Sequence, residues 1–283
     1  ARAEESLVSL ADAGGASETA LERACGLARL RGDAEAEARH LGRLLQERPR
    51  DSNLLARLAD ALKAAGKIKE RCQVLERLAD SDPNVLLELA RTYRETLDDP
   101  AAAHDTLARW LEVEPGDRQG LALMVELCEQ LGEPLEQALH LRALHRLEPA
   151  GRRRVDLSTR LARLEERAGN LEQAEAAWRQ ALTEAEDDGR IVASLTDNLS
   201  RQEKWEELCI LLEERLASTR FTVQLRGRLA TQLGEVYLER LGDERAAITW
   251  LQHAAALSPD NERAHRRLMG LLRERKDYAG AAE

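Results

Sequence analysis

Aromatic residues, lysine and long apolar runs are all scarce in this sequence, and each scarcity excludes something. Aromatic side chains make up 3% of the chain, which disfavours a series of stacking platforms for bases or sugars. No run of about 18 apolar residues occurs, so no transmembrane helix is predicted. No targeting segment is visible, although the chain starts at Ala1 without a Met. Only five of the 42 basic residues are Lys, and together with abundant alanine this is typical of a GC-rich genome, so we expect a bacterial protein.

The cysteines are few and far apart: Cys25, Cys72, Cys128 and Cys209. They form no CxxC pair, and each falls on the apolar side of a predicted helix. This pattern favours buried free thiols over a disulfide framework or a zinc site. Unpaired thiols are typical of a reducing compartment. We therefore expect a cytoplasmic protein, and the missing initial Met leaves a periplasmic or envelope-associated location open.

The balance of charge is acidic, with a formal net charge of -10. Residues 1–150 carry 20 basic and 28 acidic side chains, and residues 151–283 carry 22 and 24. An acidic surface repels a phosphate backbone, so no nucleic-acid partner is expected. The C-terminal half is close to neutral, and a local basic patch there remains compatible with this balance.

Catalytic and cofactor-binding motifs are missing from the sequence. It has no GxSxG or HExxH motif, and Gly14-Gly15 follows no strand and lacks the spacing of a phosphate-binding loop. His140 and His145 are five residues apart, which misses the spacing that places two ligands on one helix face. Glu136 and His140 have that spacing, but two residues do not make a site. We therefore predict no catalytic residue, no metal site, no cofactor and no enzymatic activity.

Apolar residues recur at helical spacing along the whole chain, and no alternating stretch predicts a strand, so the fold class is all-α. The seven prolines agree, since each falls at the start or the end of a predicted helix. The sequence predicts a helix over residues 1–13, then a helix from Ser17 to Gly32 and its partner ending at Pro49. The next pairs are 51–66 with 67–80, 84–97 with 100–114, 118–131 with 134–148, 155–168 with 171–185, 190–202 with 204–217, and 222–241 with 244–257. The first helix of a final pair spans 261–275, and the second helix of that pair starts at Tyr278.

The helix pairs repeat one another in sequence. LGEVYLERLGDERAAITWLQHAAALSP, which ends at Pro259, matches LARTYRETLDDPAAAHDTLARWLEVEP, which ends at Pro115. Most of the predicted ends of second helices are about 34 residues apart, and two gaps are longer. A fixed period of this length is typical of a repeat array in which neighbouring units share a continuous core.

This pattern resembles the tetratricopeptide repeat (TPR) family. The matching residues of the best repeat are Leu233-Gly234, Tyr237, Ala247, Trp250 or Leu251, Ala254 and Pro259, and Leu161-Ala162, Gly169, Ala174, Trp178 and Ala181 match in the fifth. The array is degenerate, because the third and seventh repeats carry an extra residue and the sixth has no closing proline. The resemblance implies a right-handed α-solenoid of stacked antiparallel helix pairs. It implies one domain over 1–283, with about seven and a half repeats, as a piece of a longer array.

The resemblance also implies a function, because the first helix of each TPR pair lines a concave groove that binds peptides or partner proteins. The groove positions carry acidic residues together with these arginines: Arg91, Arg94, Arg163, Arg167, Arg228, Arg263, Arg266 and Arg273. We therefore expect a non-catalytic scaffold or adaptor that binds a protein partner. The alternative is a regulatory or scaffolding arm of a larger enzyme or multiprotein machine.

The helix predicted over residues 261–275 gives the most specific expectation about the partner. Arg263, Arg266 and Arg273 are spaced to share one helical face, and guanidinium groups bind carboxylates in pairs of hydrogen bonds. An acidic segment of the partner is therefore expected at the C-terminal end of the groove. The competing interpretation is that these arginines only solvate the helix, or pair with a following repeat.

Overall fold

The computed structural model describes residues 6, 9, 17–218 and 220–274. Within these ranges the chain forms fifteen helices and no strand, which confirms the all-α prediction. Apart from Ser6 and Ser9, the helix expected over residues 1–13 lies outside the described residues, and so does the one expected from Tyr278. None of the described helices combines the length and the hydropathy needed to cross a membrane.

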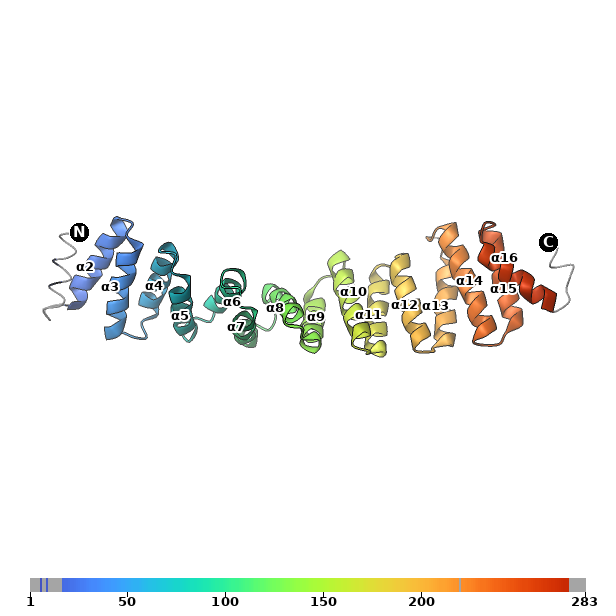
Figure 1. Ribbon diagram of the computed structural model, residues 1–283, viewed down its shortest axis with the longest axis horizontal. Helices are drawn as coiled ribbons and strands as arrows, with labels where there is room; N and C mark the ends of the chain where they lie inside the picture. Colours follow the sequence, from blue (N-terminus) through green and yellow to red (C-terminus); the bar gives the residue numbers. More distant parts are fainter. Residues whose placement is uncertain (1–5, 7–8, 10–16, 219, 275–283) are drawn as a thin grey trace. The chain divides into compact units, whose positions relative to one another are not determined.

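The contacts divide the chain into two compact units, Ala1–Leu147 and Glu148–Glu283, and each is described by itself. In the first unit successive helices form hairpins, labelled α2 to α9 in Figure 1. Their bounds are α2 (Ser17–Leu30), α3 (Ala34–Glu47), α4 (Ser52–Ala64), α5 (Ile68–Ala79), α6 (Val85–Glu95), α7 (Pro100–Val113), α8 (Arg118–Leu131) and α9 (Pro134–Leu147).

The second unit continues the same pattern of paired helices. Its helices are α10 (Arg152–Arg167), α11 (Leu171–Glu184), α12 (Gly189–Arg201), α13 (Trp205–Ala217), α14 (Val223–Glu239), α15 (Glu244–Leu257) and α16 (Glu262–Glu274). Helix α10 begins at Arg152, three residues before the predicted start at residue 155. Gly151 makes this early start possible, since its φ of 139° is rarely open to other residues.

Aspartates fix where many of these helices begin. Asp51 accepts hydrogen bonds from the amides of Asn53 and Leu54, and Asp117 does the same for Gln119 and Gly120. Asp33, Asp99, Asp188 and Asp243 cap other helices in the same way. Each such cap satisfies an amide that has no partner within the helix and contributes about 1 kcal/mol. Local sequence therefore determines most of the helix starts.

The first unit buries its apolar residues in two clusters between the hairpins. One is formed by α2 to α6, and the other spans α5 to α8 around Leu107, Trp110 and Met124. All four cysteines of the chain are buried and free, which confirms the prediction of unpaired thiols. Cys25 and Cys72 lie in the first cluster and Cys128 in the second.

The second unit is built around large buried side chains, of which Trp178 and Leu233 are 1% and 0% exposed. The four tryptophans of the chain differ in burial. Trp110 and Trp178 are buried, whereas Trp205 and Trp250 are half-buried. The guanidinium carbon of Arg240 lies 4.8 Å from the centre of the Trp205 ring, so that ring meets a cation instead of a closed core.

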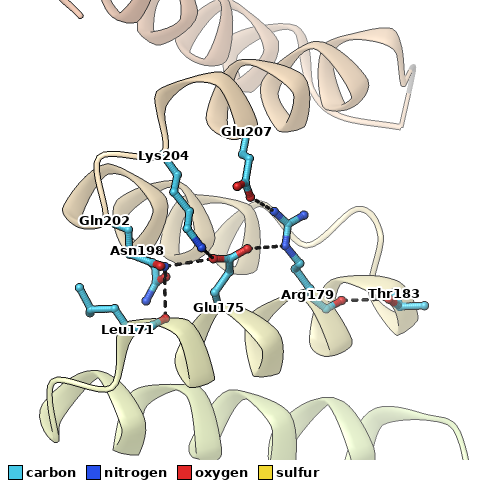
Figure 2. A network of polar contacts seen from close by, with 8 residues as sticks. All are labelled: Leu171, Glu175, Arg179, Thr183, Asn198, Gln202, Lys204 and Glu207. Atoms are coloured by element: carbon cyan, nitrogen blue, oxygen red, sulfur yellow. Dashed lines mark hydrogen bonds and ion pairs between the residues drawn. The ribbon is translucent and has the colours of Figure 1, made fainter.

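A buried carboxylate connects three helices of the second unit (Figure 2). Glu175 of α11 lies 2.8 Å from the Lys204 Nζ at the start of α13 and 2.8 Å from Arg179 Nε. Gln202, at the end of α12, donates to the same carboxylate at 3.1 Å and to the Leu171 carbonyl at 3.2 Å. Arg179 also reaches Glu207 of α13 at 3.1 Å. These polar contacts hold α11, α12 and α13 together, because the buried carboxylate of Glu175 pairs with donors from all three.

Candidate functional site

The start of α16 is tied to α14, and this places the arginines of the last described helix. Asn261 caps α16, because its Oδ1 accepts the Ala264 amide at 3.2 Å. The Nδ2 of the same side chain donates to Thr231 Oγ1 of α14 at 2.9 Å. One residue therefore sets both the first turn of α16 and its distance from α14.

The apolar side of α16 packs into the second unit and leaves a hollow beside it. Ala264, Leu271 and Leu272 are buried, and Leu271 joins a cluster with Ala247 and Leu251 of α15. The hollow, called here the α16 hollow, has a volume of about 700 Å³ and is lined by Leu238, Arg263, Arg266, Arg267, Gly270 and Leu271. Three guanidinium groups therefore border a space whose floor includes two leucines.

Two of the three arginines are held by carboxylates of α14. Arg263 binds Glu235 through two parallel contacts, Nε to Oε1 at 2.6 Å and Nη2 to Oε2 at 2.7 Å. Hydrogen bonding to Glu235 raises the pKa of Arg263 above its already high value, so its charge is permanent. Arg267 Nη2 lies 2.6 Å from Glu239 Oε1. The register of α16 against α14 therefore fixes both guanidinium groups.

The charged side chains around the hollow differ in how far they are exposed. The Glu235 side chain is 11% exposed, whereas that of Arg263 is 72% exposed. Arg266 is 80% exposed and makes one loose contact, 3.5 Å to Glu262 on its own helix, whose side chain is 85% exposed. The shielded carboxylate is that of Glu235, so Arg263 presents its guanidinium to solvent above its own partner. Such groups prefer carboxylates and phosphates, which they bind in pairs of hydrogen bonds.

The predicted site residues are not all in one place. Arg263 and Arg266 line the hollow, but Arg273 does not, and the sequence analysis left out Arg267 from its site. The missed signal was a matched spacing, because Arg263 and Arg267 are four residues apart, as are their partners Glu235 and Glu239. Arg228 on α14 and Arg273 on α16 are exposed, as are Arg163 and Arg167 on α10.

In the first unit, the predicted groove arginines are paired with the next hairpin. Arg91 of α6 donates to Gln119 Oε1 of α8 at 2.9 Å. Arg94 of α6 lies 2.6 Å from Glu126 of α8. These contacts join first helices of adjacent hairpins, so both arginines have a structural role.

One group of residues offers the donor atoms of a metal site. His104, Cys128, Glu133 and Glu136 place one ligand atom each within 4.8 Å of one another. All four lie in the first unit, far along the sequence from the α16 hollow.

The hairpin of α14 and α15 matches a known protein family. Residues 227–261 match the model of the tetratricopeptide repeat family. The TPR resemblance is confirmed. The matched range contains the repeat that ends at Pro259, which is also the strongest TPR repeat by sequence. A search of the curated proteins returned no match.

Solved structures similar to this chain include TPR proteins. A TPR protein from Parabacteroides merdae is 17% identical, over 91% of this chain and 100% of that one, with a TM-score of 0.39. YrrB, described as a TPR protein with an unusual peptide-binding site, is 12% identical over 68% and 96%, with a TM-score of 0.40. Naa15/Naa10 bound to HypK-THB gives 18% identity over 90% of this chain and 39% of that one, with a TM-score of 0.48. At these identities the likeness concerns the fold alone.

Proposed function

We infer that this chain is a protein-interaction scaffold and that the α16 hollow binds an acidic segment of a partner protein. The observation that supports this most directly is the gathering of three guanidinium groups around the hollow. Three guanidinium groups border about 700 Å³ of open space, and the carboxylate most closely paired with them, Glu235, lies beneath Arg263.

The pairing with α14 favours binding, because it orients the cations in advance. Arg263 donates to Glu235 through Nε and Nη2, which leaves the other N–H groups of its guanidinium for a ligand. A side chain that is already ordered loses less entropy when a ligand binds. Arg266 supplies a further guanidinium at the surface. Leu238 and Leu271 add an apolar floor, so a segment with acidic and aliphatic residues would fit the hollow better than an isolated anion.

The experiment uses the full chain and a fluorescent peptide of alternating glutamate and serine. A matched peptide carries glutamine in place of each glutamate, and fluorescence anisotropy gives both affinities. We expect the acidic peptide to bind more tightly and to lose affinity as salt rises, because exposed charges are screened. Arg266→Glu should weaken its binding by about tenfold or more, since charge reversal replaces an attraction with a repulsion.

Arg190→Glu is the matched control, since Arg190 is an exposed arginine at the start of α12 in the same unit. It makes the same change in net charge at a distance in sequence from α16. The proposal fails if the neutral peptide binds equally well, or if Arg190→Glu and Arg266→Glu weaken binding by the same factor.

A further inference from the structure

Three successive helices of the first unit bring an imidazole, a thiol and two carboxylates to one point. His104 comes from α7, Cys128 from α8, Glu133 from the turn after α8, and Glu136 from the first turn of α9. The four candidate ligand atoms all lie within 4.8 Å of one another. His104 and Cys128 are 24 positions apart in the sequence, so no ligand-spacing motif indicates the cluster.

The turn between α8 and α9 explains how Cys128 and Glu133 come together. Gly132 has a φ of 74° and ends α8 in the left-handed conformation, with its amide bonded to the Cys128 carbonyl. The Glu133 amide donates to the same carbonyl at 2.9 Å. Pro134 then begins α9, whose first turn carries Glu136. This tight turn therefore brings together Cys128, Glu133 and Glu136, which supply three of the four candidate ligands.

The distances fit a small tetrahedral metal ion. His104 Nε2 lies 3.2 Å from Glu136 Oε1 and 3.8 Å from Glu133 Oε2. Zinc bonds of about 2.0–2.3 Å place neighbouring ligand atoms of a tetrahedron about 3.3–3.8 Å apart. The other separations are at most 4.8 Å, and those that involve Glu133 or Glu136 shorten if the carboxylates rotate. Both glutamate side chains are partly exposed, at 48% and 38%, so they are free to make that movement.

Protein contacts alone leave part of this cluster unsatisfied. His104 Nε2 is buried and makes no well-formed hydrogen bond among the described residues, and the carboxylate oxygen Glu136 Oε1 lies 3.2 Å from it. A buried ring nitrogen without a partner is costly. The two carboxylates also share the site, where their like charges repel each other. A divalent cation would satisfy the nitrogen lone pair and neutralise both carboxylates.

Outer contacts of the kind found around metal ligands are also present. His104 Nδ1 lies 3.5 Å from Asp105, and a carboxylate on the far nitrogen orients a metal-binding imidazole. His140 Nε2 lies 3.5 Å from Glu136 Oε1 and stands behind that carboxylate. The Cys128 side chain is completely buried. Binding an ion would displace the thiol proton to solvent.

We propose that His104, Cys128, Glu133 and Glu136 bind one divalent transition-metal ion of the zinc class. Mixed nitrogen, sulfur and oxygen ligands in a tetrahedral arrangement are typical of Zn²⁺, whereas Mg²⁺ and Ca²⁺ require oxygen ligands. Four protein ligands leave no open position, so the site is structural and not catalytic. The ion would link α7 to the α8–α9 hairpin and stiffen the junction between two repeats. This inference is independent of the α16 hollow, which lies in the other unit.

The test uses the full chain stripped of metal and titrated with Co²⁺, which reports on its ligands by absorption. We expect one Co²⁺ per chain, visible bands of a tetrahedral ion, and a thiolate-to-cobalt charge-transfer band that Zn²⁺ abolishes by displacement. Cys128→Ala should remove the charge-transfer band. Glu133→Gln alters a half-exposed side chain, so the chain should still fold, and it should lower the affinity for Zn²⁺ by about tenfold or more, as loss of even an outer partner does.

Cys209→Ala is the matched control, because Cys209 is equally buried but lies in the second unit. It should leave the Co²⁺ spectrum and the Zn²⁺ affinity unchanged. The proposal is overturned if the chain gives no charge-transfer band, or if Cys128→Ala and Glu133→Gln bind the ion as tightly as the parent chain does. Circular dichroism of each variant distinguishes lost binding from lost structure.

Discussion

Glu235 lies beneath Arg263 and holds its guanidinium in a two-contact ion pair, with distances of 2.6 and 2.7 Å between the paired atoms. The carboxylate belongs to α14 and the guanidinium to α16, so the pair joins two helices that are separated in sequence by α15. Arg267 also approaches Glu235, at 3.6 Å. Glu235 is therefore the anchor through which α14 sets the position of both arginines.

The first prediction concerns this anchor. Glu235→Gln and Arg263→Met should each increase hydrogen exchange in α16, because α16 loses a contact with α14. A double-mutant cycle should give a coupling of about 0.5–1 kcal/mol, since Arg263 is largely exposed and exposed pairs contribute little. Mass-spectrometric hydrogen exchange resolved to α16 measures this. Strict additivity of the two changes would show that the pair contributes nothing.

The second prediction concerns the largest buried side chain of the second unit. Trp178→Ala should lower the free energy of unfolding by about 3–5 kcal/mol, and Leu233→Ala by about 2–5 kcal/mol. Trp178→Phe should cost less, because it keeps most of the volume and loses only the hydrogen bond from Nε1 to Glu166 at 2.9 Å. Urea unfolding followed by circular dichroism measures each change. Ile210→Ala, at a side chain that is 57% exposed, is the control and should change stability by less than about 0.5 kcal/mol.

The third prediction is a dependence on pH through Glu175 (Figure 2). Burial raises its pKa, but hydrogen bonds from Lys204, Arg179 and Gln202 outweigh this and lower the pKa below the ordinary value of 4.5. Because the folded-state pKa is the lower one, the stabilisation is complete above pH 4.5 and is lost as the pH falls through the folded-state value. Glu175→Gln should therefore be less stable than the parent by about 1–3 kcal/mol at pH 7.

The difference in stability between the parent and Glu175→Gln should decrease as the pH falls. Urea unfolding at a series of pH values below 7 measures it. Glu172→Gln is the control, since Glu172 is an exposed carboxylate one turn earlier on α11. A gap between Glu175→Gln and the parent that stays constant into acid would contradict the assignment of the effect to this carboxylate.

The fourth prediction compares one substitution at two helical glycines. A Cβ on Gly234 of α14 would lie 2.8 Å from Leu251 Cγ of α15, whereas Gly26 of α2 has open space around it. Replacing Gly by Ala within a helix gains about 0.5–1 kcal/mol. Gly26→Ala should show that gain, and Gly234→Ala should be less stable than this by about 1–3 kcal/mol because of overpacking. Equal gains at both positions, by urea unfolding, would show that α14 and α15 do not approach closely.

Local sequence determined the helices and the type of repeat. The apolar spacing showed which face of each helix is buried, and the aspartates and prolines marked where helices start and end, because caps and proline act within one turn. The bounds of α8 agree with prediction, Arg118–Leu131. The start of α10 was predicted three residues too late, since a run of three arginines after Gly151 has no apolar residue to mark the first turn.

Only the tertiary structure decided which polar side chains meet. The sequence placed Arg263 on a groove position but did not show that Glu235, 28 positions earlier, already holds it. It likewise offered Glu136 and His140 as an isolated pair, whereas packing of α7 against α8 and α9 brings His104 and Cys128 to Glu136. The physical reason is that periodicity fixes directions around one helix axis, whereas distances between side chains depend on how far apart and at what register two helices pack.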